Sequence, residues 1–198
     1  PNSITEETLL GKKIRLAVKN NINIYASHTN LDVVEDGIND LIVSLLGFDK
    51  GLVMEGSAMA SNKEKEGIGR LIDLKKPISL EDLCNKVKED LKLSYIRYSG
   101  EPSWMVNKIA IINGSGQDYF YLAKKLGANC IITGDTTYHY VSDFYEEGIA
   151  VIDAGHFGTE WPAVKLFAEN FKKLLENEKI DLVVKVSERN FDPYKIMV

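Results

Sequence analysis

The chain has 198 residues, enough for one large domain or two small lobes with a buried core. Hydrophobic residues make up 44% of the chain and charged residues 27%, proportions that are typical of globular proteins and exclude a disordered chain. The formal net charge of −5 argues against nucleic acid or an anionic membrane surface as a partner, so any phosphate-bearing ligand would need local attraction.

The first half of the chain alternates between helical and strand-like apolar periods. A capping box at residues 3–6 and a helical apolar stripe predict a helix over residues 5–20. Alternating apolar residues then predict a strand over residues 22–27. The elements expected after it are a helix over 36–46, a strand over 67–74, a helix over 79–91 and a strand over 93–98.

The second half has a regular alternation of strands and helices. Strands are expected over 108–113, 130–133, 149–153 and 182–186, with helices in the three intervals between them. This alternation implies right-handed crossovers and a largely parallel sheet, so the predicted fold class is α/β. Residues 1–50 and 107–198 are assigned to one main α/β lobe, and residues 51–106 to a smaller second lobe or an insertion.

The cysteines and the apolar runs indicate in which cellular compartment the protein is expected. Cys84 and Cys130 are too few for a disulfide framework, and their apolar neighbours predict that both are reduced core residues. No apolar run approaches the length of a membrane span, and no signal peptide is recognisable. We therefore expect a cytoplasmic protein.

Two histidine–carboxylate pairs follow predicted strands. His28 and Asp32 come after the strand over 22–27, and His156 and Glu160 come after the strand over 149–153. Ligands of parallel α/β sheets bind beyond the carboxyl ends of the strands, where both pairs are expected. Each pair has a four-residue spacing, which puts its two side chains on one side of a helix or tight turn. The sequence therefore predicts a divalent metal held by these four residues.

Plainer interpretations of these and neighbouring residues remain open. A single His-x-x-x-Asp or His-x-x-x-Glu pair is more often a salt bridge or a helix cap than a pair of metal ligands. The glycine-rich turn at Ser115 and Gly116 could hold a phosphate or could simply join a strand to a helix. Asp135 could contact the ligand or only cap a helix, and His139 could transfer a proton or be an ordinary half-exposed histidine.

The motifs together resemble a known family. They occur in order as Tyr-Ala-Ser-His-Thr-Asn-Leu-Asp at 25–32, Gly-Ile-Asn-Asp at 37–40, Gly-Ile-Gly-Arg at 67–70, Gly-Ser-Gly at 114–116, Ile-Thr-Gly-Asp-x-x-Tyr-His at 132–139 and Ile-Asp-Ala-Gly-His-x-x-x-Glu at 152–160. This series, which runs over nearly the whole chain, resembles the NGG-interacting factor 3 family, also named GTP cyclohydrolase I type 2 homologs.

The resemblance implies two α/β lobes with mixed, largely parallel sheets and a two-metal cleft between them, within a homohexamer. It implies that His28, Asp32, His156 and Glu160 are metal ligands. The ions could be Zn, Fe, Mn, Co or Ni, since nitrogen and oxygen donors without sulfur do not discriminate among them. The family usually supplies a further pair of histidines upstream. No histidine precedes His28, and the chain begins at Pro1, so we expect that an N-terminal segment is missing.

Three functions remain open. The first is a metal-dependent hydrolase of a nucleotide or another phosphate-bearing small molecule, GTP cyclohydrolase-like by family name only, with His139 in proton transfer and Ser115, Gly116 and Asp135 at the phosphate. The second is a non-catalytic, metal-stabilised oligomer that binds regulatory partners. The third is a phosphate or nucleotide sensor that uses the glycine-rich turn without chemistry.

Overall fold

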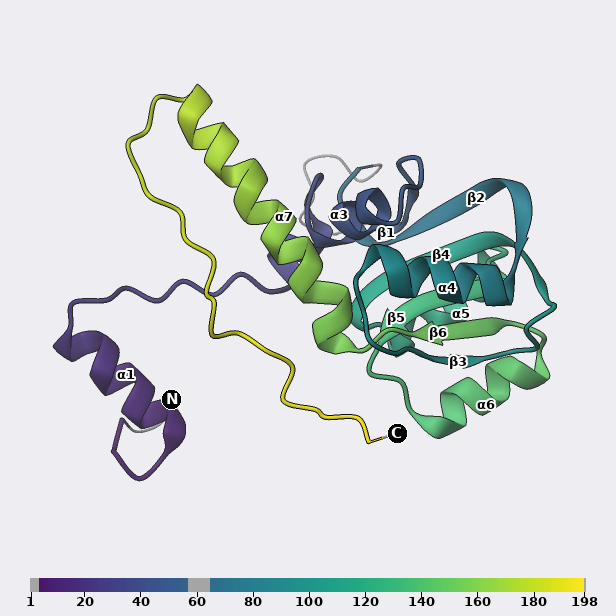
Figure 1. Cartoon of the computed structure of the whole chain (residues 1–198), viewed down its shortest axis with the longest axis horizontal. Helices are drawn as coiled ribbons and strands as arrows, with labels where there is room; N and C mark the ends of the chain where they lie inside the picture. Colours follow the sequence, from purple (N-terminus) through teal and green to yellow (C-terminus); the bar gives the residue numbers. More distant parts are fainter. Residues whose placement is uncertain (1–3, 57–64, 198) are drawn as a thin grey trace.

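The computed structural model describes residues 4–56 and 65–197 of the chain. The described residues form seven α-helices and six strands, shown in chain order in Figure 1. The helices are α1 (Leu9–Lys19), α2 (Thr29–Val33), α3 (Ile38–Leu45), α4 (Leu80–Asp90), α5 (Phe120–Lys125), α6 (Tyr138–Glu146) and α7 (His156–Asn177), with a 3₁₀ turn η1 (Gln117–Tyr119) before α5. The strands are β1 (Leu52–Gly56), β2 (Gly67–Ser79), β3 (Arg97–Ser99), β4 (Met105–Ser115), β5 (Cys130–Gly134) and β6 (Ala150–Asp153).

All six described strands belong to one sheet, in the order β1-β2-β4-β5-β6-β3. Only β4–β5 and β5–β6 pair in parallel, whereas β1–β2, β2–β4 and β3–β6 pair antiparallel. The α/β class and the mixed sheet are therefore confirmed, but the expectation of a largely parallel sheet is wrong. The strands from residues 51–106 pair at both sides of β4, β5 and β6, so within the described residues this segment has no sheet of its own.

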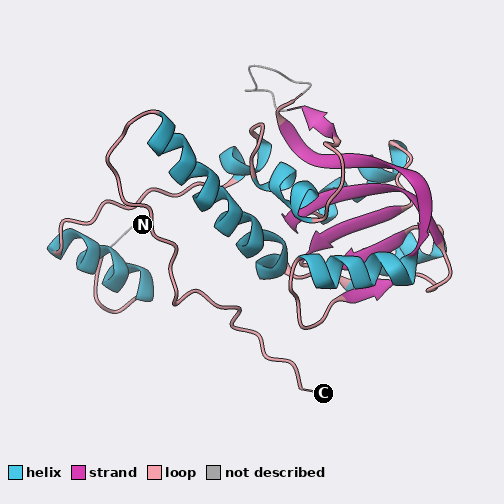
Figure 2. Ribbon diagram, turned by 45° about the horizontal axis from the view of Figure 1, so that its top comes forward, coloured by secondary structure: helices cyan, strands magenta, loops and turns pink. Residues whose placement is uncertain are grey.

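The sheet is the middle layer of three, with helices on both of its faces (Figure 2). Successive residues of the central strands point to opposite faces, as the pleat requires. In β4, Ile109 and Ile111 pack into a core with α3, α4 and α7, and Ala110 and Ile112 pack into a second core with α5 and α6. Burial on both faces explains why β4, β5 and β6 read as continuous apolar runs.

Two predicted strands are wrong. Residues 22–27 and 182–186 run as irregular, mostly exposed chain. The alternation of Ile22 and Ile24 was the signal for the first, yet both side chains are exposed and no other strand pairs with them in the described structure. A strand that the sequence analysis missed, β1, lies at the edge of the sheet beside β2.

The helix predicted over 5–20 is confirmed as α1, although it begins later. Thr8 is its N-cap, and the Thr8 hydroxyl accepts a hydrogen bond from Gly11 N at 3.0 Å. Ser3 of the expected capping box lies outside the described residues. In both ribbon views α1 stands away from the α/β body, joined to it by the extended residues 20–28 (Figures 1 and 2).

Both cysteines are core residues, as predicted. Cys84 on α4 and Cys130 on β5 are free thiols in the same hydrophobic core. Burial raises the pKa of Cys84 to about 11 and raises that of Cys130 further. Among the described residues, no helix combines the length and the apolar character needed to cross a membrane.

Candidate metal and ligand site

The carboxyl ends of β4, β5 and β6 lie together at one edge of the sheet, because these three strands are parallel neighbours. Asn113 and Gly114 belong to the end of β4, Asp135 follows β5, and His156 opens α7 directly after β6. The helix α2, which carries Asp32, lies at the same place, since Asn113 Nδ2 donates to Asp32 Oδ1 at 2.9 Å. Three strand ends and one short helix therefore surround a common site.

His156 is the centre of the polar contacts at this site. Its Nδ1 lies 2.6 Å from Asp135 Oδ2, and its Nε2 lies 3.0 Å from Glu160 Oε1. Burial lowers the pKa of His156, but the hydrogen bond to Asp135 and the charge of Glu160 outweigh this, and the pKa lies above its ordinary value. The structure thus brings together the predicted pair His156 and Glu160, within one turn of α7.

Two glycines, Gly134 and Gly114, allow this close arrangement. A Cβ on Gly134 would lie 2.5 Å from the carbonyl carbon of Gly155 and 2.6 Å from His156 N, so only glycine lets the β5 and β6 ends approach. Gly114 has a φ of +58°, and a Cβ there would lie 3.1 Å from Glu160 Oε1 and 3.3 Å from His156 Nε2. Any side chain at position 114 would therefore crowd both of these atoms.

Thr159 fixes the end of β4 to the first turn of α7. Its hydroxyl accepts a hydrogen bond from Gly114 N at 3.0 Å and donates to the backbone carbonyls of Gly155 and His156. Thr159 is buried, with 1% of its surface exposed. It was not identified from the sequence, although its place one residue before Glu160 in the last motif was a usable signal.

Asp32 lies within electrostatic range of both predicted histidines. Burial raises its pKa above the ordinary value, against smaller lowering effects from the Asn113 hydrogen bond and from the charges of His28 and His156. His28 is exposed at the start of α2, where its Nδ1 lies 3.3 Å from Thr29 Oγ1. Within residues 4–56 and 65–197, no three His, Cys, Asp or Glu side chains are close enough to hold one ion as they stand. Convergence of all four predicted ligands on a shared ion stays a prediction.

The donors nevertheless fit a divalent cation in kind. Two imidazoles and two carboxylates supply the nitrogen and oxygen ligands that Zn²⁺, Mn²⁺ and related ions accept. Two of these donors, the nitrogen of His156 and the oxygen of Glu160, already lie next to each other beside Gly114. A cation between them would replace the direct contact of 3.0 Å between these two side chains.

A cavity of about 780 Å³ opens next to His156. Its lining combines charged, hydroxyl and aromatic side chains from β3, the β5 and β6 ends, α7 and the C-terminal segment: Tyr95, Arg97, Asp135, Thr136, Thr137, Asp153, Gly155, His156, Phe157, Glu160, Asp192, Pro193, Tyr194 and Lys195. Arg97 pairs with the buried Asp153, which also accepts from Thr136 Oγ1 at 2.5 Å. The cavity is large enough for a small-molecule ligand.

The other predicted site residues differ in their relation to His156 and the cavity. Ser115 is exposed at the end of β4, and Gly116 packs closely on Ile112 and Thr133. Asp135 contacts His156, which favours a role in orienting that ring over contact with a phosphate that its charge would repel. His139 is exposed on α6 against the ring of Tyr138 and is not part of the cavity lining described above.

A family model described as Duf34/NIF3 (NGG1p interacting factor 3) matches residues 1–193. The chain is 50% identical to the GTP cyclohydrolase 1 type 2 homolog of Clostridium acetobutylicum over 98% of its own length and 72% of that protein. It is 45% identical to the protein of the same name from Clostridium perfringens, covering 100% of this chain and 73% of that protein. The crystal structure of Staphylococcus aureus protein SA1388 has the same fold, with a TM-score of 0.88, 23% identity and coverage of 100% of this chain and 76% of that one.

Proposed function

Because this chain belongs to the Duf34/NIF3 (NGG1p interacting factor 3) family, we propose that it binds divalent metal and hydrolyses a nucleotide or another phosphate-bearing small molecule. The observation that carries the proposal is the contact of 3.0 Å between His156 Nε2 and Glu160 Oε1, beside the glycine at position 114. The carboxylate of Asp32 lies close enough to His156 for the charge of that imidazole to lower the pKa of Asp32, against the larger raising effect of burial. An adjoining cavity of about 780 Å³ could hold the substrate.

His156, Glu160, Asp32 and His28 would hold one or two ions, whose element the donor set leaves open among Zn, Mn, Fe, Co and Ni. When bound, such ions lower the pKa of a water molecule and stabilise negative charge that develops in the transition state. They would also make the site attractive to phosphate, despite the net charge of −5 on the chain.

The protein's own residues would orient the ligands and the substrate. Asp135 accepts from His156 Nδ1, which leaves Nε2 as the atom directed at Glu160 and at the metal. Ser115 and Gly116 are the proposed phosphate contacts at the end of β4. His139 is the proposed proton-transfer residue, and this role requires that the substrate reach α6 from the cavity.

The test is metal binding by the purified chain. We expect the wild type to bind Zn²⁺ or Mn²⁺, and His156→Ala and Asp32→Ala each to lower the affinity at least about tenfold, since even outer partners of metal ligands contribute that much. Elemental analysis after dialysis and competition with a chromophoric chelator would measure this. His139→Ala, which removes an exposed histidine away from the cavity, is the matched control and should bind metal as the wild type does. Unchanged metal in both ligand variants would contradict the proposal.

A second function, a metal-stabilised homo-oligomer without catalysis, is favoured by exposed apolar surface. On α1, Leu9, Leu16 and Val18 are 69%, 62% and 70% exposed, which is unusual for an amphipathic helix. We propose that this surface contacts further copies of the chain, in a hexamer. Metal-loaded protein that turns over no member of a nucleotide and phosphoester panel would favour this function over hydrolysis. In both cases we propose a cytoplasmic location, in keeping with two buried free thiols.

A further inference from the structure

Asp32 is held in place by two asparagines from different elements. Asn113, at the end of β4, donates through Nδ2 to Asp32 Oδ1 at 2.9 Å. Asn39, on α3, donates through Nδ2 to the backbone carbonyl of Asp32 at 3.0 Å, and its Oδ1 accepts from Asn113 N at 3.2 Å. The three residues thus tie α2 to α3 and to the central strand β4.

The burial of Asn39 shows that this arrangement is specific. Asn39 is completely buried on a helix whose other inward side chains are mostly apolar, including Ile38, Leu41 and Ile42. Burying an amide is unfavourable unless its donor and acceptor atoms form hydrogen bonds. The nitrogen of Asn39 donates to Asp32, and its oxygen accepts from Asn113, which in turn holds the Asp32 carboxylate. An apolar residue at position 39 would pack without that cost but would not hold Asp32.

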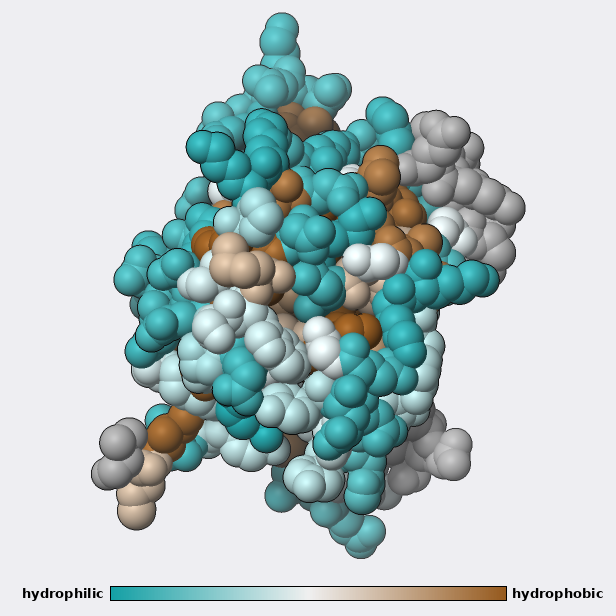
Figure 3. All heavy atoms as spheres, turned by 90° about the vertical axis from the view of Figure 1, so that its right-hand side faces the viewer, coloured by the Kyte–Doolittle hydropathy of each residue, from teal (hydrophilic) through white to brown (hydrophobic). Residues whose placement is uncertain are grey.

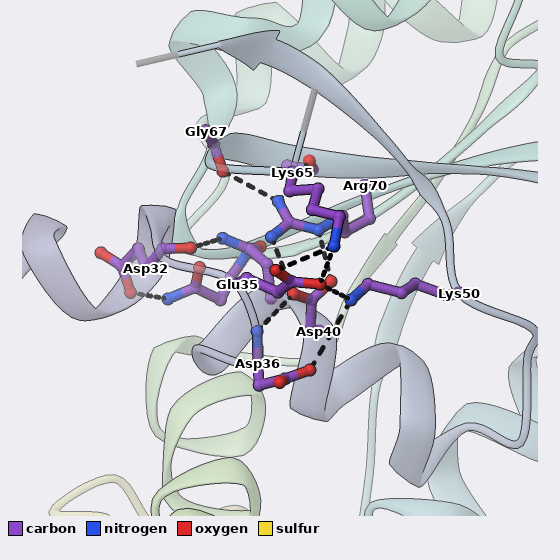
Figure 4. A network of polar contacts seen from close by, with 11 residues as sticks. Asp32, Glu35, Asp36, Asp40, Lys50, Lys65, Gly67 and Arg70 are labelled. Carbon is purple, nitrogen blue, oxygen red and sulfur yellow. Dashed lines mark hydrogen bonds and ion pairs between the residues drawn. The ribbon is translucent and has the colours of Figure 1, made fainter. Parts of the chain in front are cut away.

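Asp32 and Asp40 have different polar partners, as Figure 4 shows. Asp40 has both oxygens matched by the guanidinium of Arg70, at 2.5 Å and 3.0 Å, so its charge is neutralised within the core. Among the described residues, only the neutral amide of Asn113 donates to the carboxylate of Asp32. An amide orients a carboxylate without cancelling its charge, which leaves Asp32 able to attract a cation.

We infer that Asn113 and Asn39 are positioning residues, which fix one oxygen of Asp32 so that the other is presented to the metal. This inference rests on the proposed metal site and extends it to two residues outside the ligand set. Asn113 acts on the carboxylate directly, and Asn39 acts by holding the backbone of both Asp32 and Asn113.

The experiment replaces Asn113 by leucine, which has the same branching at Cγ but no donor, and measures Zn²⁺ affinity by chelator competition on the full chain. We expect Asn113→Leu to weaken Zn²⁺ binding by about 10-fold to 100-fold, the range for partners that orient metal ligands. Asn113→Ala, which removes the amide without adding bulk, should weaken Zn²⁺ binding similarly. It takes the place of Asn113→Leu if the leucine variant does not fold. Urea unfolding in the absence of metal would show how much of any effect is a loss of stability.

Asn129→Ala is the matched control, because Asn129 makes three side-chain hydrogen bonds at the other end of β4, to Met105, Asn107 and Lys108. It should lower stability at least as much as Asn113→Leu and leave Zn²⁺ affinity within about twofold of the wild type. If the wild type binds Zn²⁺ and the Asn113 variants bind it equally well, the positioning role is overturned while the metal site stands. If the wild type binds no Zn²⁺ or Mn²⁺, the proposed function and the positioning role both fall.

Discussion

Arg70 and Asp40 form an ion pair that is almost completely removed from water. Their side chains are 1% and 7% exposed, and two parallel hydrogen bonds join them. Arg70 also donates through Nη1 to the carbonyls of Gly67 and Gly69, at 2.8 Å and 3.0 Å. Every one of these contacts satisfies a group that would otherwise be buried without a partner, so the pair behaves as a single structural unit.

Removing one member of this pair should be costly. We expect Asp40→Ala to lower the free energy of unfolding by about 3–5 kcal/mol, because the guanidinium of Arg70 would stay buried without a counter-charge. Urea unfolding followed by circular dichroism measures this. Asp73→Ala, which breaks the more exposed pair with Lys108, should cost at most about 1 kcal/mol. A loss below about 1 kcal/mol for Asp40→Ala would contradict the structural role given to this pair.

At the scale of residues, the sequence predicted His156 and Glu160 as a pair because four positions on a helix bring two side chains together. It did not predict Asp40 with Arg70, or Asn113 with Asp32, because these partners are 30 and 81 positions apart. Such contacts depend on which elements the fold places side by side, and spacing within a motif carries no information about that. The motifs at residues 67–70 and 37–40 contain Arg70 and Asp40, but neither motif indicates that these two side chains pair.

Among the elements, most of those with a buried apolar face were predicted well, whereas two exposed segments were wrongly predicted as strands. The helices α3, α4 and α7 and the strands β2, β4, β5 and β6 lie close to their expected ranges, since each buries an apolar stripe or run. Residues 22–27 have a strand-like alternation but no sheet to complete it. Alternation alone therefore cannot distinguish a strand from an extended connection with apolar side chains.

The N-cap of helix α4 can be tested by a single substitution. Ser79 is its N-cap, and the Ser79 hydroxyl accepts from Asp82 N at 3.1 Å and donates to Asp82 Oδ2 at 2.6 Å. We expect Ser79→Ala to lower the free energy of unfolding by about 1 kcal/mol, because the first turn loses this bond. Ser44→Ala, on the exposed side of α3, should change stability by less than about 0.5 kcal/mol. Equal effects of the two substitutions in thermal unfolding would argue against the cap.

For the whole molecule, the order β1-β2-β4-β5-β6-β3 explains why the sheet is less parallel than expected. The regular alternation of strands and helices holds only for β4, β5 and β6, and these three strands are parallel as predicted. The outer strands come from residues 51–106 and join antiparallel on both sides. The parallel centre is what places Asn113, Asp135 and His156 at one edge, so the part of the topology that positions the candidate site was predictable.

The distribution of apolar surface leads to a prediction about assembly. The face of the α/β body that lies opposite α1 is mainly hydrophilic, with smaller apolar areas between polar ones (Figure 3). By contrast, Leu9 and Leu16 are exposed on one side of α1, seven positions apart, on a helix that stands away from the body. Large apolar side chains that are exposed in a single chain are often covered by a partner, and further copies of the chain are the proposed cover.

We therefore expect light scattering to give a mass of several times the 22.2 kDa of one chain, six times if the hexamer forms. Leu9→Glu combined with Leu16→Glu should shift the protein to a smaller species, because each substitution would put a charge into an apolar contact. The same two changes should leave the unfolding of the α/β body unaltered, since both side chains are exposed within a single chain. Asn85→Glu, an added charge on the exposed side of α4, should leave the mass unchanged. A wild-type mass equal to one chain would overturn the assembly, and an unchanged large mass in the α1 variant would place the contact elsewhere.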